Sequence, residues 1–279
     1  MSASSAARRG RSSPLSDRDL AILRKLQGFR LATGDHLRRL HFTEGSPITR
    51  DRRCRSVLKR LTDVGLIGRL DRRVGGLHGG SQGFVYSLQG RGSGALARLD
   101  GTEPRRPRGE PGERFVAHVL AITETYVRLH EATGPERRHE LLSFDPEPTC
   151  WRRYPAPHGG VSVLRPDAYV RVADTDYEDA FFVEIDRATE SLTTIRAKCQ
   201  AYAAYWRSGT EQASAGVFPK VVWIVPSEHR AHGIRRTISR LNQAEQQLFT
   251  VTTEADALSA LLPSSDLLPT TSSKGGATS

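Results

Sequence analysis

A strand with carboxylates on one of its faces constrains the fold of this chain more than any other feature. Residues 180–186 read Ala-Phe-Phe-Val-Glu-Ile-Asp. Because successive side chains of a strand point to opposite faces, apolar residues at alternate positions share one face, while Glu184 and Asp186 share the other. Buried carboxylates cost free energy unless a cation neutralises them. The segment therefore predicts a strand of an α/β domain with a charged site on one side.

The segments around this strand alternate between helical and strand periodicity. Apolar residues at steps of three and four predict helices over 114–131 and 192–206. Strands are predicted at 140–144, 167–172, 180–186, 221–225 and 248–252, with a basic helix around 228–247 and a short helix around 254–262. The resulting order, α-β-β-β-α-β with an extension, predicts an α/β domain over residues 114–262.

The N-terminal part has the pattern of a small DNA-binding domain. We expect, in order, a helix that Ser16 caps, a short helix over 33–40, and a longer basic helix that Thr49 caps. Strands at 65–70 and 84–88 around a glycine-rich tip then form a hairpin. Three helices followed by such a hairpin predict a winged helix-turn-helix domain over residues 16–90.

Positive charge is concentrated in the same part of the chain. Residues 1–113 hold 23 Lys and Arg against 11 Asp and Glu, and the whole chain has a net charge of +10. Such an excess favours a polyanionic partner, here double-stranded DNA. The candidate DNA contacts on the third helix and near the hairpin tip are Thr49, Arg50, Arg52, Arg53, Lys59, Arg72 and Arg73. The alternative is a winged helix used for dimerisation or another protein contact.

Composition gives the predicted domain boundaries. Residues 1–15 and 263–279 are rich in small polar residues and are expected to be disordered tails, while 91–113 is dense in Gly, Pro and Arg and is expected to be a linker. The longest apolar run, 221–225, is far shorter than a membrane helix, and no apolar block indicates a secretory signal. Three widely separated cysteines do not suggest a disulfide framework. We expect a cytoplasmic, two-domain α+β protein.

A third carboxylate is placed at the start of a neighbouring strand. Asp167 follows Pro166, which disfavours a position inside a sheet. We expect Asp167, Glu184 and Asp186 to converge as oxygen ligands of Mg²⁺ or Mn²⁺, which binds carboxylates together with phosphate and water. Such an ion activates water for phosphodiester cleavage. The alternative is that the carboxylates form structural ion pairs with Arg152, Arg165 or Arg187.

These residues and their order resemble a known nuclease pattern. Pro166-Asp167 and the run 183–186, within this order of elements, resemble the PD-(D/E)xK nuclease superfamily. More narrowly, the basic winged helix, the run 182–190 and the helix around 198–202 resemble the replication-relaxation family of actinobacterial plasmids and integrated mobile elements, over about residues 16–262. The resemblance implies a role in replication, topology or transfer of such DNA. It also implies a restriction-endonuclease-like fold for the C-terminal domain.

One position departs from the nuclease pattern. Asp186 stands where the superfamily has a lysine that holds water and stabilises negative charge. Lys198, one of five lysines in the chain, is the first candidate to replace it from the following helix. Gln200 is the second candidate, although it lies about 200° around that helix from Lys198. Together with Asp167 and Glu184, these residues complete the candidate catalytic set.

Two functions remain open at this point. The first is a DNA-binding protein with a magnesium-dependent endonuclease or nickase domain. The second is a non-catalytic replication initiator or transcription regulator with a degenerate nuclease fold; a transcription regulator with an unrelated α/β sensor domain is a third. Self-association as a homodimer and contacts with replication or transfer proteins also stay open.

Overall fold

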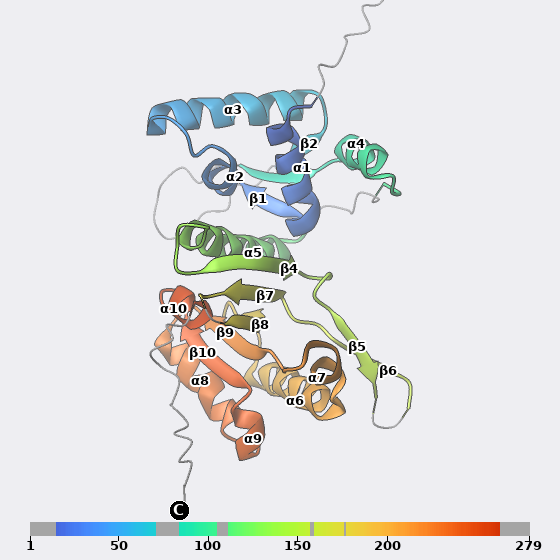
Figure 1. Ribbon diagram of the computed structural model, residues 1–279, viewed down its shortest axis with the longest axis vertical. Coiled ribbons are helices and arrows are strands. Elements are labelled where there is room, and N and C mark those ends of the chain that lie inside the picture. The colour runs from blue at the N-terminus through green and yellow to red at the C-terminus, as the bar shows by residue number, and fades with distance from the viewer. Residues whose placement is uncertain (1–14, 71–83, 105–110, 157–158, 176, 263–279) are drawn as a thin grey trace, which may run out of the picture. The chain divides into compact units, whose positions relative to one another are not determined.

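The chain divides into two structural units. The computed structural model describes residues 15–70, 84–104, 111–156, 159–175 and 177–262. Residues 1–123 form unit 1 and residues 124–279 form unit 2, with the division inside helix α5 (Glu113–Ala132). Helices and sheets occur in both units (Figure 1), which confirms the expected α+β class. The predicted disordered tails, apart from Leu15, and the hairpin tip with Arg72 and Arg73 lie outside the described residues.

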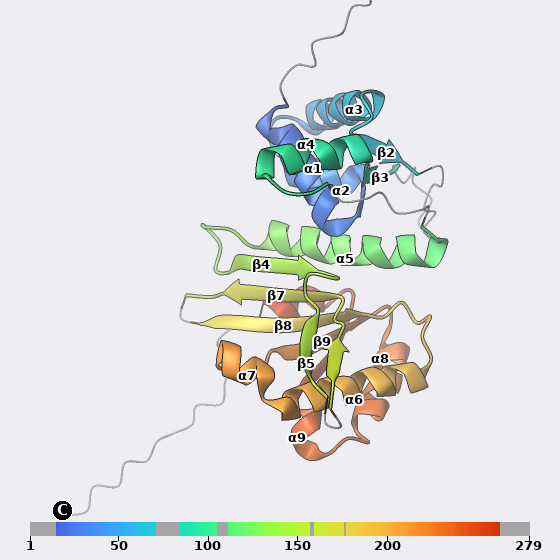
Figure 2. The same cartoon turned by 90° about the vertical axis from the view of Figure 1, so that its right-hand side faces the viewer.

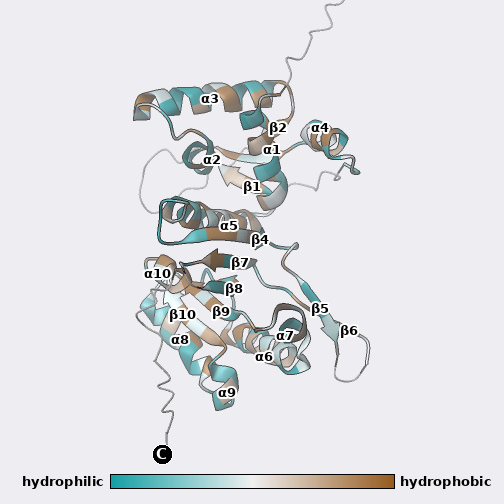
Figure 3. Ribbon diagram, viewed as in Figure 1, coloured by the Kyte–Doolittle hydropathy of each residue, from teal (hydrophilic) through white to brown (hydrophobic). Residues whose placement is uncertain are grey.

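Unit 1 consists of helices around a small antiparallel sheet. Its elements are α1 (Asp17–Phe29), β1 (Leu31–Thr33), α2 (Gly34–His41), α3 (Pro47–Asp63), β2 (Ile67–Arg69), β3 (Val85–Leu88) and α4 (Gly90–Asp100). The strand order is β1-β3-β2. Teal and brown residues alternate along α3 (Figure 3), because its apolar side chains join the core and its polar ones face solvent.

Capping residues set where the helices of unit 1 begin. Ser16 caps α1 as predicted, because its hydroxyl accepts a hydrogen bond from the Asp19 amide at 3.2 Å. The predicted cap of the third helix is wrong by three residues. Ser46 rather than Thr49 caps α3, and Pro47 occupies the first turn, where a residue without an amide hydrogen is well tolerated.

Part of the expected linker is helical. Helix α4 occupies the first half of residues 91–113, and its Leu96 is fully buried. Gly92, one of the glycines that suggested a linker, instead allows close packing, because a Cβ atom there would lie 2.2 Å from the carbonyl oxygen of Leu66. Glycine content alone therefore misassigned this segment.

Unit 2 is built on a five-stranded mixed sheet. Its strands are β4 (Glu140–Pro146), β7 (Ala168–Ala173), β8 (Glu178–Ile185), β9 (Lys220–Val225) and β10 (Phe249–Thr253), in the spatial order β10-β9-β8-β7-β4. The pairs β4–β7 and β7–β8 are antiparallel, whereas β8–β9 and β9–β10 are parallel. Parallel neighbours require crossover connections, which α6 (Leu192–Ser208) and α8 (Glu228–Ile238) supply.

Helices α6 and α8 pack on the same side of this sheet, below the strands in Figure 2. Phe182 of β8 and Trp223 of β9 share a core cluster with Ile195 and Tyr202 of α6 and Ile234 of α8. Because side chains alternate along a strand, Glu184 points from β8 to the same side as Phe182. The sheet therefore directs one carboxylate toward α6.

Several elements of unit 2 differ from those predicted. The sequence analysis did not predict the hairpin of β5 (Arg152–Pro155) and β6 (Val161–Leu164) or helix α7 (Thr210–Ala215). The last helix, α10 (Ala257–Leu261), is shorter than the predicted one. The helix predicted around 228–247 is divided into α8 and a short α9 (Gln243–Gln246). The division has a local cause, because the Asn242 side chain accepts a hydrogen bond from the Glu245 amide and starts a new helix.

Candidate functional site

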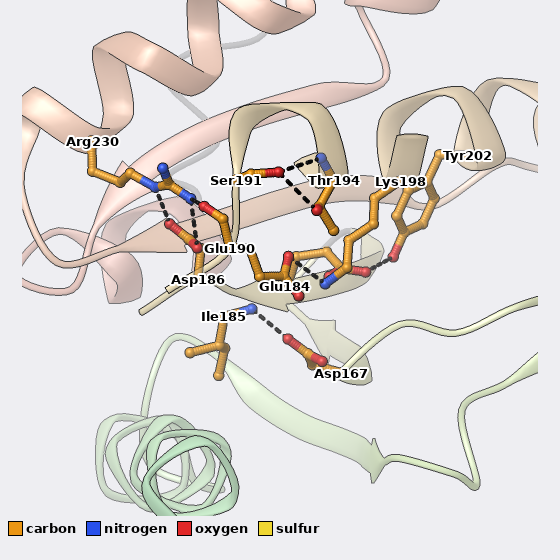
Figure 4. Close-up of polar contacts among 10 residues, drawn as sticks. All are labelled: Asp167, Glu184, Ile185, Asp186, Glu190, Ser191, Thr194, Lys198, Tyr202 and Arg230. Carbon is orange, nitrogen blue, oxygen red and sulfur yellow. Dashed lines mark hydrogen bonds and ion pairs between the residues drawn. The ribbon is translucent and has the colours of Figure 1, made fainter. Parts of the chain in front are cut away.

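Glu184 is the centre of a buried polar cluster in unit 2 (Figure 4). It lies near the end of β8 and is 1% exposed. Its Oε1 accepts a hydrogen bond from the Tyr202 hydroxyl at 2.7 Å, and its Oε2 accepts one from Lys198 Nζ at 3.1 Å. Lys198 and Tyr202 are four residues apart on α6, so one face of that helix meets the carboxylate.

Asp167 reaches the same region from the neighbouring strand. It immediately precedes β7, and the antiparallel register places Ala168 opposite Val183 of β8. The Asp167 amide donates to the Val183 carbonyl, and Asp167 Oδ2 accepts a hydrogen bond from the Ile185 amide at 2.7 Å. The strand pairing thus holds a second buried carboxylate close enough to Glu184 for their charges to interact.

The charges in this cluster change its protonation. Burial, followed by the negative charge of Asp167, raises the pKa of Glu184 to about 7. Burial lowers the pKa of Lys198, but the carboxylates of Glu184, Asp167 and Glu190 outweigh it and raise that pKa overall. Glu190 Oε2 lies 3.1 Å from Lys198 Nζ. Lys198 therefore remains cationic at neutral pH and compensates a buried carboxylate.

The third predicted carboxylate is held elsewhere. Asp186 is bound by Arg230 through two hydrogen bonds, Nε to Oδ2 at 2.5 Å and Nη2 to Oδ1 at 3.0 Å. Arg230 Nη2 also donates to the Glu190 carbonyl at 2.7 Å. The expected convergence of Asp167, Glu184 and Asp186 is thus not found, and no three metal-ligating side chains meet at one point within the described residues.

Asp186 instead agrees with the alternative that these carboxylates form structural ion pairs. Its side chain is fully buried and that of Arg230 is 15% exposed. Its partner is none of the three arginines expected from the sequence. Arg230 belongs to α8, which lies further along the chain than all three. Arg152, one of those three, pairs with Glu211. Gln200, the second candidate on α6, is exposed, whereas Lys198 contacts Glu184.

In unit 1, α3 presents basic side chains on its outer surface. Cys54, Leu58 and Leu61 form its buried stripe. At about 100° per residue, Arg52 lies opposite this stripe and Arg53 on one flank. Both arginines are exposed, and neither forms an ion pair with any acid in the described part of unit 1.

The other predicted contacts on α3 are less available. Lys59 forms an exposed ion pair with Asp63 at 2.7 Å. Thr49 and Arg50 are half-buried, and Arg50 Nε is buried without a hydrogen-bond partner. Arg60, which the sequence also places on the basic face, binds the buried Asp19 at 2.5 Å. The structure thus separates the paired basic residues of α3 from the unpaired ones.

The comparison with protein families identifies the chain. A family model described as replication-relaxation matches residues 23–221, from within α1 to β9. The chain belongs to the replication-relaxation family. The matched region includes α3 of unit 1 and the residues around Glu184 in unit 2, so both candidate sites lie within the family's shared sequence. This membership points to a role in the replication or relaxation of plasmid or mobile-element DNA.

Neither the curated proteins nor the solved structures contain a match to this replication-relaxation protein. Its described helices include none with the length and apolarity that a membrane crossing requires.

Two aromatic residues of the unit 2 cluster were not predicted as part of the site. Tyr202 lies one turn along α6 from Lys198, and its hydrogen bond to Glu184 was not predicted. Trp223 lies opposite Glu184 in the β8–β9 register, with its ring centre 5.7 Å from Lys198 Nζ. Its Nε1 is buried without a hydrogen-bond partner. The sequence does not fix the register that places Trp223 opposite Glu184, so no sequence signal singled out Trp223.

The raised pKa of Glu184 makes the stability of this replication-relaxation protein depend on pH. Between about pH 4.5, the ordinary pKa of the group, and pH 7, the folded protein retains a proton that the unfolded chain releases. The free energy of unfolding should therefore fall as the pH rises through this interval, by an amount on the order of 3 kcal/mol. Urea unfolding in EDTA, followed by tryptophan fluorescence, measures this decline.

Glu184→Gln should remove this part of the pH dependence, because the amide does not titrate. Glu178→Gln is the matched control, since Glu178 is an exposed residue of the same strand. The three tryptophans all belong to unit 2, so the fluorescence signal reports on the relevant unit. Superimposable pH profiles for wild type and Glu184→Gln would contradict the expectation.

Proposed function

We propose that this protein binds duplex DNA of a plasmid or mobile element and acts on it through a divalent-metal site in unit 2. The meeting of Asp167, Glu184 and Lys198 carries this proposal (Figure 4). Two carboxylates beside a cationic lysine are suited to metal-dependent phosphodiester hydrolysis. Membership of the replication-relaxation family supports plasmid or mobile-element DNA as the substrate.

The order of strands in unit 2 favours a restriction-endonuclease-like core. Strands β4, β7 and β8 pair as successive antiparallel neighbours, α6 crosses over, and β9 joins β8 in parallel. Asp167 precedes the second of these strands and Glu184 lies in the third, which agrees with the spacing of the PD-(D/E)xK pattern. Lys198 on α6 then takes the place of the motif lysine, whose position is occupied by Asp186.

The chemistry of the two carboxylates fits one Mg²⁺ or Mn²⁺ ion. Asp167 and Glu184 are buried acids whose mutual repulsion contributes to the raised pKa of Glu184, and a cation between them would relieve it. Mg²⁺ uses one or two carboxylates and completes its coordination with phosphate and water. When bound, the ion would activate a water and stabilise charge on the scissile phosphate. Asp186 is outside this set because Arg230 holds it.

Lys198 contributes a positive charge that does not depend on the ion. Its Nζ remains protonated beside Glu184 and Glu190. In the proposed site this ammonium group orients the attacking water or stabilises the negative charge that develops on the phosphate. Tyr202 orients the Glu184 carboxylate through its hydroxyl, whose pKa is raised well above the usual value by burial and by Glu184 itself.

The order of elements in unit 1 supports a winged helix that positions the duplex. Three helices are followed by β2 and β3, and β1 pairs with β3 to complete the sheet. In such domains the third helix enters the major groove. Here that helix is α3, and its exposed Arg52 and Arg53 have forked donors suited to phosphate and guanine.

The DNA-binding part is tested with the variant Arg52→Ala/Arg53→Ala. Loss of two unpaired arginines should weaken binding to a labelled duplex by about tenfold or more and should make its salt dependence shallower by a slope of about 1–2. Fluorescence anisotropy across a salt series measures both quantities. Arg24→Ala/Arg98→Ala is a control of equal charge in unit 1, on α1 and α4. Equal losses in the two variants would argue against α3 as the DNA-binding helix.

The metal site is tested by nicking of supercoiled plasmid. Nicking by the wild-type protein should require Mg²⁺ or Mn²⁺ and should stop in EDTA. A second candidate function is a non-catalytic role in DNA replication, favoured by the full engagement of Glu184 and Asp186 oxygens within the protein. Duplex binding without nicking in either metal would decide for that second function.

A further inference from the structure

A small cavity in unit 2 lies between the start of α6 and the end of α8. Its volume is about 140 Å³. The residues that line it are Leu192, Thr193, Arg196, Gly233, Arg236, Thr237 and Arg240. A cavity of this size holds several water molecules or one tetrahedral anion.

Three arginines line this cavity without a compensating acid. Arg196, Arg236 and Arg240 are all exposed, and none of them forms an ion pair within the residues that the structure describes. Two other arginines of α8 behave differently, because Arg230 binds Asp186 and Arg235 binds Glu228. The first turn of α6 contains no acidic residue either. Positive charge at the cavity is therefore left for an external anion.

The composition of the cavity wall indicates which anion. Guanidinium groups donate paired hydrogen bonds and match the oxygens of a phosphate group. Arginines that line one cavity repel each other, and a bound phosphate would remove this repulsion. The Thr193 side chain adds a hydroxyl that can donate to a phosphate oxygen.

We infer that this cavity binds a backbone phosphate of duplex DNA, and this inference rests on the proposed function. The cavity is separate from the carboxylate cluster. Arg196 and Lys198 are two residues apart on α6, so they point about 160° away from each other around the helix. Lys198 meets Glu184, whereas Arg196 faces the cavity shared with α8. Unit 2 thereby has a DNA anchor of its own.

The test uses the full chain with Arg196→Ala/Arg236→Ala/Arg240→Ala. Affinity for a labelled duplex should fall by at least about tenfold, and the slope of log affinity against log salt should become shallower by about 1, as expected for one lost phosphate contact. Arg137→Ala/Arg153→Ala/Arg171→Ala removes the same charge from positions of unit 2 outside the cavity and should have little effect. Equal behaviour of the two triple variants would overturn the inference.

A second variant keeps all three arginines. Gly233→Glu places a carboxylate in the cavity, and its Cβ would lie no closer than 3.6 Å to Leu192, which is ordinary contact. It should weaken duplex binding as the triple variant does, with thermal unfolding unchanged. Wild-type duplex affinity in Gly233→Glu would overturn the inference.

Three further outcomes distinguish a failure of this inference from a failure of the proposed function. Calorimetric titration with pyrophosphate tests whether the cavity binds free phosphates instead. If the triple variant loses pyrophosphate binding but keeps the duplex affinity of the control, the assignment to DNA is overturned. Duplex binding that falls in Arg52→Ala/Arg53→Ala but not in the cavity variants would reject the cavity alone. Absence of duplex binding by the wild type would reject the proposed function together with the cavity.

Discussion

Glu184→Gln is expected to lower metal-dependent nicking by a factor on the order of 100 or more. The substitution preserves the size of the side chain and its acceptor for the Tyr202 hydroxyl, but it removes the negative charge that would hold a cation beside Asp167. Rates of conversion of supercoiled to open-circular plasmid, at fixed Mg²⁺ or Mn²⁺, give the comparison. Duplex affinity should stay at the wild-type value, because α3 is unchanged.

Lys198→Met extends the same prediction to the cation of the cluster. Methionine keeps the length of the side chain and removes the ammonium group that lies 3.1 Å from Glu184, so nicking should fall by a similar factor. Glu178→Gln and Lys220→Met are matched controls from the exposed surface of the same sheet. Nicking at the wild-type rate in Glu184→Gln would place the activity elsewhere and refute the site.

Arg230→Ala is expected to lower the free energy of unfolding by about 3–5 kcal/mol. Asp186 is fully buried, and Arg230 supplies both hydrogen bonds to its carboxylate, so the truncated protein would contain an uncompensated buried charge. The same substitution removes a donor from the Glu190 carbonyl. Urea unfolding at neutral pH, followed by tryptophan fluorescence, measures the loss.

Two comparisons isolate the effect of the buried pair. Arg235→Ala removes an arginine from the same helix, but its partner Glu228 is exposed, so the change should stay below about 1 kcal/mol. Adding Asp186→Asn to Arg230→Ala removes the buried charge and should recover part of the stability. If Arg230→Ala and Arg235→Ala lower the free energy of unfolding equally, the buried ion pair with Asp186 does not stabilise the protein more than the exposed pair does.

The order of elements could be predicted from the sequence where periodicity was strong. The helix and strand patterns of unit 2 gave β4, β7, β8, α6 and β9 in the right order, because each spans enough residues for a clear period. Short elements were missed: β1 has three residues, and α7 has six. Helix α4 was missed for another reason, since its Gly92 allows a close approach to Leu66 rather than ending the helix.

The candidate site could be predicted only as far as local geometry extends. Strand alternation predicted that Glu184 lies on the face opposite Phe181, Val183 and Ile185, and Lys198, the candidate from the following helix, contacts it. The ion pair of Asp186 could not be predicted from the spacing of residues, because its partner Arg230 is 44 residues further along the chain. Alternation fixes the side of a sheet to which a carboxylate points, whereas its neighbours there depend on the packing of distant helices.

The mixed sheet of unit 2 also bears on how the unit folds. Its parallel pairings, β8 with β9 and β9 with β10, each join strands across two intervening helices, and β7 pairs with β4 across the β5–β6 hairpin. Such non-local pairings require closure of long loops, which slows folding relative to a helical bundle. The packing of α6 on the sheet covers the Glu184 side chain and shields it from solvent. Asp167 and Glu184 come together in the local antiparallel pairing of β7 with β8, so the helix that buries Glu184 also brings the Lys198 ammonium group that compensates both carboxylates.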